Sequence, residues 1–173
     1  TRRRHANYYL EMIHGVQPVL WGGDSKAALE LLEANHDNLR AAVDWSLEAD
    51  ETEIALRLVG DLGFLWMAHR YVTEGNDKGE RALAATGDAP PDAPAPALIA
   101  AGLVALQLAD TERATAHFDE SLDLYREVGD AAGVARATYC QAGVPWSAGD
   151  MDRAGPMLED LLVLEGLEAD PWG

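Results

Sequence analysis

Small residues recur at regular intervals along the second half of the chain, and this recurrence constrains the fold more than any other feature. A shift of 40 residues lays Asp110 on Asp150, and a shift of 39 residues lays Tyr71 on Asp110. Small side chains at fixed places let two helices approach closely, so the chain is predicted to be a series of helix hairpins. In this register each of three units has one small residue in its first helix and one in its second: Gly63, Gly102 and Ala142, then Gly75, Ala114 and Ala154.

Hairpins of this kind are typical of the tetratricopeptide repeat, in which a large apolar residue packs between successive hairpins. Phe118 and Leu158 stand at that position. The usual period is about 34 residues, so longer helices or connectors must absorb the additional length. We predict an all-α fold, a tetratricopeptide-like right-handed stack of antiparallel helix hairpins with an N-terminal helical pair. The alternative is an alanine-rich helical bundle whose internal similarity is accidental.

Apolar residues at helical spacing place the individual helices. Gly22 and Gly23 separate the first two, and Asp24 or Ser25 caps the second. We predict one continuous domain, with the helical pair over 1–50 and repeats at about 51–86, 95–128 and 131–167. The apolar stripe from Ile54 to Trp66 marks the third predicted helix, and the others span about 3–19, 25–48, 72–85, 97–108, 111–128, 131–148 and 151–167.

Prolines and one glycine disturb this pattern. The stretch from Gly87 to Pro96 cannot continue a helix, because proline lacks the N–H donor, and it is predicted to be an ordered connector or a short flexible loop. Pro145 and Pro156 fall inside predicted helices, where each costs about 3 kcal/mol unless the helix bends. We expect bends or early helix ends there. Gly79 stands where the first unit should present a large residue to its neighbour.

The charge of the chain bears on its partners. The formal net charge is −17 at pH 7, from 30 acidic and 13 basic residues. Such a surface repels phosphate backbones and anionic lipids, so no direct contact of this chain with nucleic acid or with a membrane is expected. No apolar run approaches the roughly 20 residues that span a bilayer, and no signal-peptide pattern opens the chain. We therefore expect a cytoplasmic protein, and the start at Thr1 rather than at methionine is expected of a piece of a longer one.

Residues that carry catalysis or bind metals are not arranged for either task. Cys140 is alone, no G-x-S-x-G elbow occurs, and no phosphate-binding loop is present. No catalytic residue, metal or cofactor is therefore expected, and the chain is predicted not to be an enzyme. A small α-helical enzyme is the least favoured alternative, and it would need a pocket with two ionisable side chains within hydrogen-bond reach. The histidines have no metal-protease spacing: His5, His14, His36, His69 and His117.

Two segments resemble a family of large bacterial regulators. They are LEANHDNLRAAVDWSLEADETEIALRLVGDL, which contains His36 and Trp45, and HRYVTEGNDKGERAL, which begins at His69. Both are similar to the linker and first repeats of the LuxR-like and antibiotic-regulatory members of the STAND ATPase class. The opening RRRHANYYLEM is similar to the entry into the same region. The chain departs from the family at Lys78 and Gly79, where a bulky pair is usual.

The resemblance implies a role for the chain. In these regulators an NTPase core switches the protein, a separate domain contacts DNA, and helical repeats receive an inducer or a partner protein. The chain would be that receiving module, with the NTPase outside it, since no phosphate-binding loop occurs in these residues.

The first helices of stacked tetratricopeptide hairpins line the concave face, which is where a ligand is expected. Aromatic residues with an occasional arginine dominate recognition sites. Arg57 and Arg136 favour a ligand with a carboxylate or a phosphate. The register sends nine candidate binding residues to this face: Arg57, Phe64, Met67, Leu103, Leu106, Gln107, Arg136, Tyr139 and Trp146.

The predicted function is therefore a sensor or interaction module that binds a protein, a peptide or a small-molecule inducer. One alternative for the candidate residues is that they only seal contacts between hairpins or are covered by the first two helices. An alternative for the whole chain is a stand-alone scaffold for protein assembly or self-association, which would use the same face or an exposed end of the stack.

Overall fold

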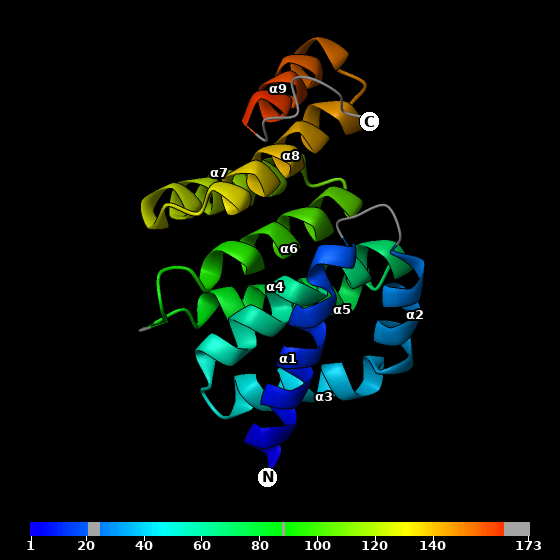
Figure 1. The fold of residues 1–173 in the computed structure, drawn as a ribbon, viewed down its shortest axis with the longest axis vertical. Coiled ribbons are helices and arrows are strands. Elements are labelled where there is room, and N and C mark those ends of the chain that lie inside the picture. Colours follow the sequence, from blue (N-terminus) through cyan, green and yellow to red (C-terminus); the bar gives the residue numbers. More distant parts are fainter. Residues whose placement is uncertain (21–24, 88, 165–173) are drawn as a thin grey trace.

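The computed structural model describes residues 1–20, 25–87 and 89–164, and all regular structure in these ranges is helical. The all-α prediction is confirmed. Figure 1 shows the nine helices of the described residues: α1 (Arg2–Leu20), α2 (Lys26–Ala34), α3 (His36–Glu48), α4 (Thr52–His69), α5 (Val72–Ala84), α6 (Pro94–Gln107), α7 (Thr111–Val128), α8 (Ala131–Ser147) and α9 (Met151–Leu164).

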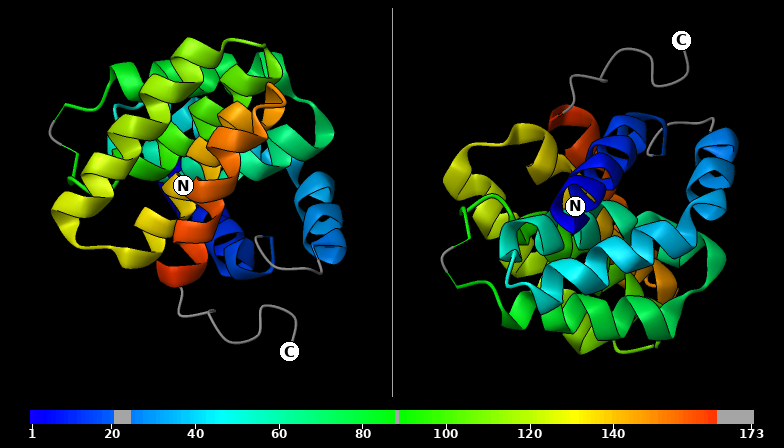
Figure 2. Two further views of the ribbon diagram at one scale, coloured as in Figure 1. Left: turned by 90° about the horizontal axis from the view of Figure 1, so that it is seen from above. Right: turned by 90° about the horizontal axis from the view of Figure 1, so that it is seen from below.

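Neighbours in sequence pack on one another and form a stack. Helix α4 contacts α5 and α6, and the contacts continue from α6 to α7, from α7 to α8 and from α8 to α9. Helix α6 lies between α4 and α8 and contacts both. Helix α1 crosses α3 and α4, and Figure 2 shows it on one side of them. The N-terminus and α9 therefore lie toward opposite ends of the molecule (Figure 1).

Three turns of the predicted register share one backbone geometry. In each of them the backbone N–H that follows the turn residue donates to the carbonyl oxygen five residues earlier, over 2.9 to 3.0 Å. A left-handed backbone is unfavourable for residues other than glycine, so two of these turns accept strain to keep the geometry. The turn residues have left-handed φ values of 59°, 59° and 76°: Arg70, Ala109 and Gly149.

Glycines of the register lie where helices cross. A Cβ added at Gly63 in α4 would lie 2.6 Å from the Cβ of Ala100 in α6. A Cβ added at Gly102 in α6 would lie 2.3 Å from the ring of Phe118 in α7. Real Cβ atoms do not approach other atoms this closely, so both crossings exclude any side chain larger than hydrogen. The remaining small residues of the register are also buried: Gly75, Ala114, Ala142 and Ala154.

The prediction of a single helix over 25–48 was wrong, because the chain turns at Asn35 between α2 and α3. The Asn35 side chain donates to the carbonyl oxygen of Leu31 over 2.9 Å and ends α2. Asparagine side chains compete with helical hydrogen bonds in this way. Residues 1–50 thus hold three helices where they are described, instead of a helical pair. The predicted break at Gly22 and Gly23 and the cap at Asp24 lie outside the described residues.

Two residues of the proline-rich connector pack against the helices. The Arg57 guanidinium contacts the Asp92 carboxylate at 2.9 Å, and Ala93 is fully buried. Helix α6 begins at Pro94, three residues before its predicted start near Ala97. The first turn of a helix accepts proline, because the N–H groups there have no partner within the helix.

Of the two outcomes expected at Pro145 and Pro156, early helix ends were wrong, while bends in the helices stay a prediction. Helix α8 continues to Ser147, and α9 continues to Leu164. Pro145 and Pro156 lie inside α8 and α9, so each leaves the carbonyl group four residues earlier without its helical N–H donor. Of the last predicted helix, residues 165–167 lie outside the described range.

Lys78 and Gly79 do not prevent the packing of α5. Lys78 is only 5% exposed, and its ammonium donates to the carboxylate of Asp44 in α3. Gly79 is buried beside Ala101 of α6. Helix α5 therefore fits between α3 and α6, with an ion pair between the buried Lys78 and the partly exposed Asp44 at its contact with α3.

Among the described residues, no helix combines the length and the apolarity that crossing a membrane requires. Cys140 is buried, as predicted for a small hydrophobe, and burial raises the pKa of its thiol to about 12.

Candidate functional site

The candidate residues on α8 form an exposed stripe. Tyr139 and Trp146 are each 58% exposed, and Arg136 is partly exposed. Residues three, four and seven apart share one side of a helix, so these three side chains lie on the same face of α8. Large exposed aromatic side chains are residues of the kind that anchor partners.

The candidate residues on α4 and α6 are mostly packed. Leu103 is buried, while Phe64, Met67 and Leu106 are partly buried against the apolar core. Gln107 donates from Nε2 to the carbonyl oxygen of Met67 over 2.7 Å and so joins α6 to α4. These side chains contribute to contacts between hairpins, which was the alternative considered for them.

Arg57 is engaged by two carboxylates. Its guanidinium lies 3.0 Å from Glu53 and 2.9 Å from Asp92. Because two negative charges already surround this cation, it attracts a ligand carboxylate or phosphate less than an unmatched arginine would.

A buried carboxylate on the same face of α4 was missed from the sequence. Asp61 is only 9% exposed, and burial raises the pKa of its carboxyl to about 6, against the lowering effect of the nearby charges of His14, Arg136 and Arg57. His14 of α1 lies 3.4 Å from the Asp61 carboxylate. Gln17 of α1 donates to the Asp61 backbone carbonyl over 2.8 Å. Helix α1 therefore covers this part of α4, and an acidic residue within the apolar run of α4 was the available signal.

Replacing Asp61 with asparagine should stabilise the protein at neutral pH. The folded-state pKa of about 6 exceeds the usual 3.8, so between these values the folded protein holds a proton that the unfolded chain has released. The associated stability is present below about pH 4 and is lost as the pH rises to about 6. Asp61→Asn, neutral at every pH, should gain up to about 3 kcal/mol over the natural protein at pH 7 and show no gain near pH 4. Urea unfolding across this pH range measures the difference, and an equal difference at both ends would contradict it.

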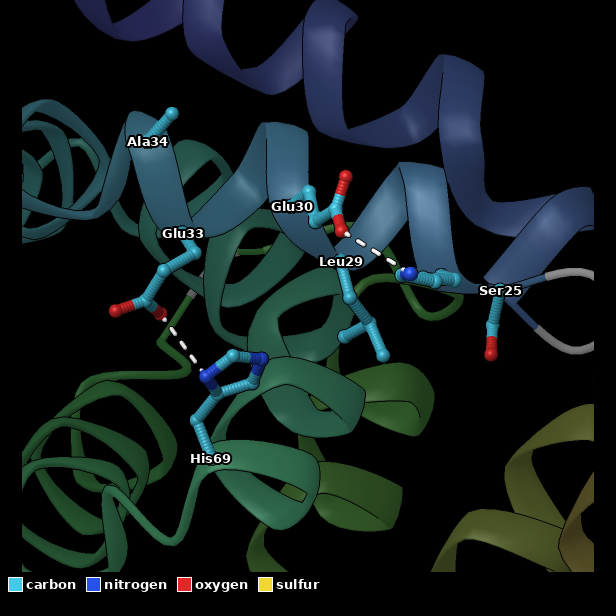
Figure 3. Close-up of a pocket in the computed structure, with 7 residues that line it drawn as sticks. Ser25, Leu29, Glu30, Glu33, Ala34 and His69 are labelled. Carbon is cyan, nitrogen blue, oxygen red and sulfur yellow. Dashed lines mark ion pairs between the residues drawn. The ribbon is translucent and has the colours of Figure 1, made fainter.

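A pocket of about 580 Å³ lies elsewhere, between α2 and the end of α4 (Figure 3). The His69 Nδ1 atom lies 3.2 Å from the Glu33 carboxylate at its edge. The pair of ionisable side chains that an enzyme would need is thus present here. The residues that line this pocket are Ser25, Lys26, Leu29, Glu30, Glu33, Ala34 and His69.

The Glu33 carboxylate is already used in contacts within the protein. Its Oε1 atom accepts a hydrogen bond from the Tyr71 hydroxyl over 2.6 Å, while Oε2 pairs with His69. The Tyr71 ring stacks on His36 at a centroid distance of 4.2 Å, and His36 lies 3.1 Å from Glu74. This network joins α2 and α3 to α4 and α5, so a structural role explains its ionisable residues.

A second pocket, of about 520 Å³, lies between α1 and α3. Its lining residues are Thr1, Arg2, His5, Ala41, Asp44, Trp45 and Glu48. None of the candidate binding residues lines either pocket. Within the described part of the chain, no three His, Cys, Asp or Glu side chains are placed to hold a metal ion.

Comparison with known proteins assigns no family to the chain. The sequence matches no family model, and no curated protein is significantly similar to it.

Proposed function

We propose that this chain is a binding module that receives a protein segment or a small-molecule inducer on the predicted concave face, of which the exposed stripe of α8 is the accessible part. The observation that carries the proposal is the pair of aromatics Tyr139 and Trp146, each 58% exposed on one face of α8. Burying a large aromatic side chain of this kind gives a partner much of its binding free energy.

A tetratricopeptide-like, right-handed stack is the fold that we propose for this module. Support comes from the three left-handed turns at Arg70, Ala109 and Gly149, which recur at the shifts of 39 and 40 residues that align the sequence. Further support comes from Gly63 and Gly102, which occupy equivalent positions and both lie at helix crossings.

The context that we propose is a cytoplasmic bacterial transcriptional regulator with a STAND-type NTPase. This proposal rests on the sequence segments around His36 and His69 that resemble such regulators. In this context the chain performs no catalysis and holds no cofactor, and DNA contact belongs to another domain. A scaffold for protein assembly or self-association is the alternative, since it would use the same exposed aromatics.

The proposal is tested by removing both aromatics from the complete protein that carries the module. Tyr139→Ala with Trp146→Ala should weaken the response of a reporter gene to the inducer by about tenfold or more, because two anchors are lost. The urea midpoint should change little, because both side chains are largely exposed. Tyr8→Ala is the matched control, since Tyr8 is an aromatic of α1 with 62% exposure. A full response of the double variant would place the input elsewhere.

A further inference from the structure

Gly143 interrupts the row of candidate side chains that the register places on the predicted concave face. In the register that aligns the three units, the position held by Phe64 in α4 and Leu103 in α6 is held by Gly143 in α8. A Cβ built at Gly143 would meet a single neighbour, the Cδ1 atom of Leu106, at the ordinary contact distance of 3.9 Å. Unlike Gly63 and Gly102, this glycine is not required by a helix crossing. Because glycine is a poor helix former, packing and helix stability alone would favour a larger residue.

The two exposed aromatics flank this gap. Tyr139 precedes Gly143 by four residues and Trp146 follows it by three, so both lie beside it on the same face. Leu106 of α6 lies next to the gap. We call this group of four residues the Gly143 notch: Tyr139, Gly143, Trp146 and Leu106. It has two aromatic sides, an apolar neighbour and the space that a side chain occupies in the other two units.

We propose that the Gly143 notch takes an aromatic or aliphatic side chain from a basic linear segment of a partner protein. This inference rests on the proposed function and specifies the partner class for the same face. The partner side chain would fill the position of Phe64 and Leu103, and the two aromatics would cover it from both sides.

Charge decides between basic and acidic occupants. The chain carries a net charge of −17, so it attracts basic segments and repels both acidic ligands and a second copy of itself. Arg136, the basic residue of the same stripe, lies near Asp61 and lowers the pKa of that carboxyl, so its charge is partly matched. The faces of Tyr139 and Trp146 also attract lysine and arginine cations.

The test uses the purified chain and a labelled synthetic peptide of about ten residues with one central phenylalanine between lysines. Two comparison peptides are also measured. One has alanine in place of the phenylalanine, and the other has glutamate in place of each lysine. Fluorescence anisotropy should show salt-sensitive binding of the first peptide and at least about tenfold weaker binding of the other two. Gly143→Leu fills the notch and should weaken binding of the first peptide by about tenfold or more. Gly155→Leu, in α9 with no atom within 4 Å of the added Cβ, is the matched control and should bind normally.

The outcomes separate this inference from the proposed function. If Trp146→Ala abolishes peptide binding but Gly143→Leu leaves it unchanged, the peptide binds the exposed stripe of α8 without using the Gly143 notch. That result would overturn this inference and keep the proposed function. Equal binding of the glutamate peptide would overturn the basic partner. Absence of binding up to about 1 mM, a free energy near −4 kcal/mol, would overturn the notch as a site for such segments. Binding unaffected by every variant on α8 would count against both proposals. The urea unfolding midpoints of Gly143→Leu and Gly155→Leu are measured as well. Midpoints equal to that of the natural protein exclude unfolding as the cause of weaker binding.

Discussion

A leucine at Gly102 should lower the free energy of unfolding by about 3 kcal/mol or more, whereas a leucine at Gly15 should leave it nearly unchanged. The Cβ at Gly102 would lie 2.3 Å from the ring of Phe118, a side chain with no exposed surface. Neither residue can yield without moving α6 away from α7. Urea denaturation followed by far-UV circular dichroism measures the loss.

Gly15 is the control because it lies on the exposed side of α1 and its added Cβ would meet no atom within 4 Å. Gly87 in the connector is less suitable, since its φ of 40° makes any side chain unfavourable there regardless of space. Combining Gly102→Leu with Phe118→Ala should recover part of the loss, because the two changes act on the same crossing. Equal midpoints for the Gly102 and Gly15 variants would show that the register places the wrong residues at the helix crossings.

Local sequence features predicted most of the helices of the described residues, since they depend on neighbours along the chain. Asp110 and Asp150 accept hydrogen bonds from the backbone N–H groups three residues later, as N-cap residues do. The left-handed turn residues Ala109 and Gly149 directly precede these aspartates, so each turn and the cap that follows it depend on neighbouring residues. The start of α6 and the division at Asn35 were missed because each depends on one residue with two plausible roles. Proline both ends and begins helices, and asparagine is found at caps as well as within helices.

Local sequence features could not predict which of the candidate binding residues are covered by other helices. Phe64 and Gly143 occupy equivalent positions, yet their surroundings differ because α1 packs on α4. The contact between Gln17 and Asp61 joins residues that are 44 positions apart, and the contact between Glu33 and Tyr71 joins residues 38 apart. Helical spacing within each segment carries no information on such pairings, so periodicity could not show which side chains stay exposed.

Removing the carboxylate of Asp44 should destabilise the protein by about 2 to 3 kcal/mol, although Asp44 itself is partly exposed. The ammonium of Lys78 is its partner, and the side chains of Lys78 and Asp44 are 7% and 42% exposed. In Asp44→Ala this ammonium stays buried between α3 and α5 with no opposite charge to offset its lost hydration. Urea unfolding at pH 7 measures the change.

Removing the lysine of this pair should cost far less stability than removing the aspartate. The cost of Asp44→Ala comes from leaving a buried cation without a partner, and not from the loss of the ion pair as such. Lys78→Met keeps the apolar stem and removes the charge, and water can hydrate the half-exposed Asp44 that remains. Its stability should be close to that of the natural protein or above it. Adding Lys78→Met to Asp44→Ala should restore most of what Asp44→Ala loses, since no buried ammonium is left. If Lys78→Met instead costs as much as Asp44→Ala, the pair itself stabilises α5. The lysine at this position would then be a source of stability for the packing of α5 rather than a replacement that the fold tolerates.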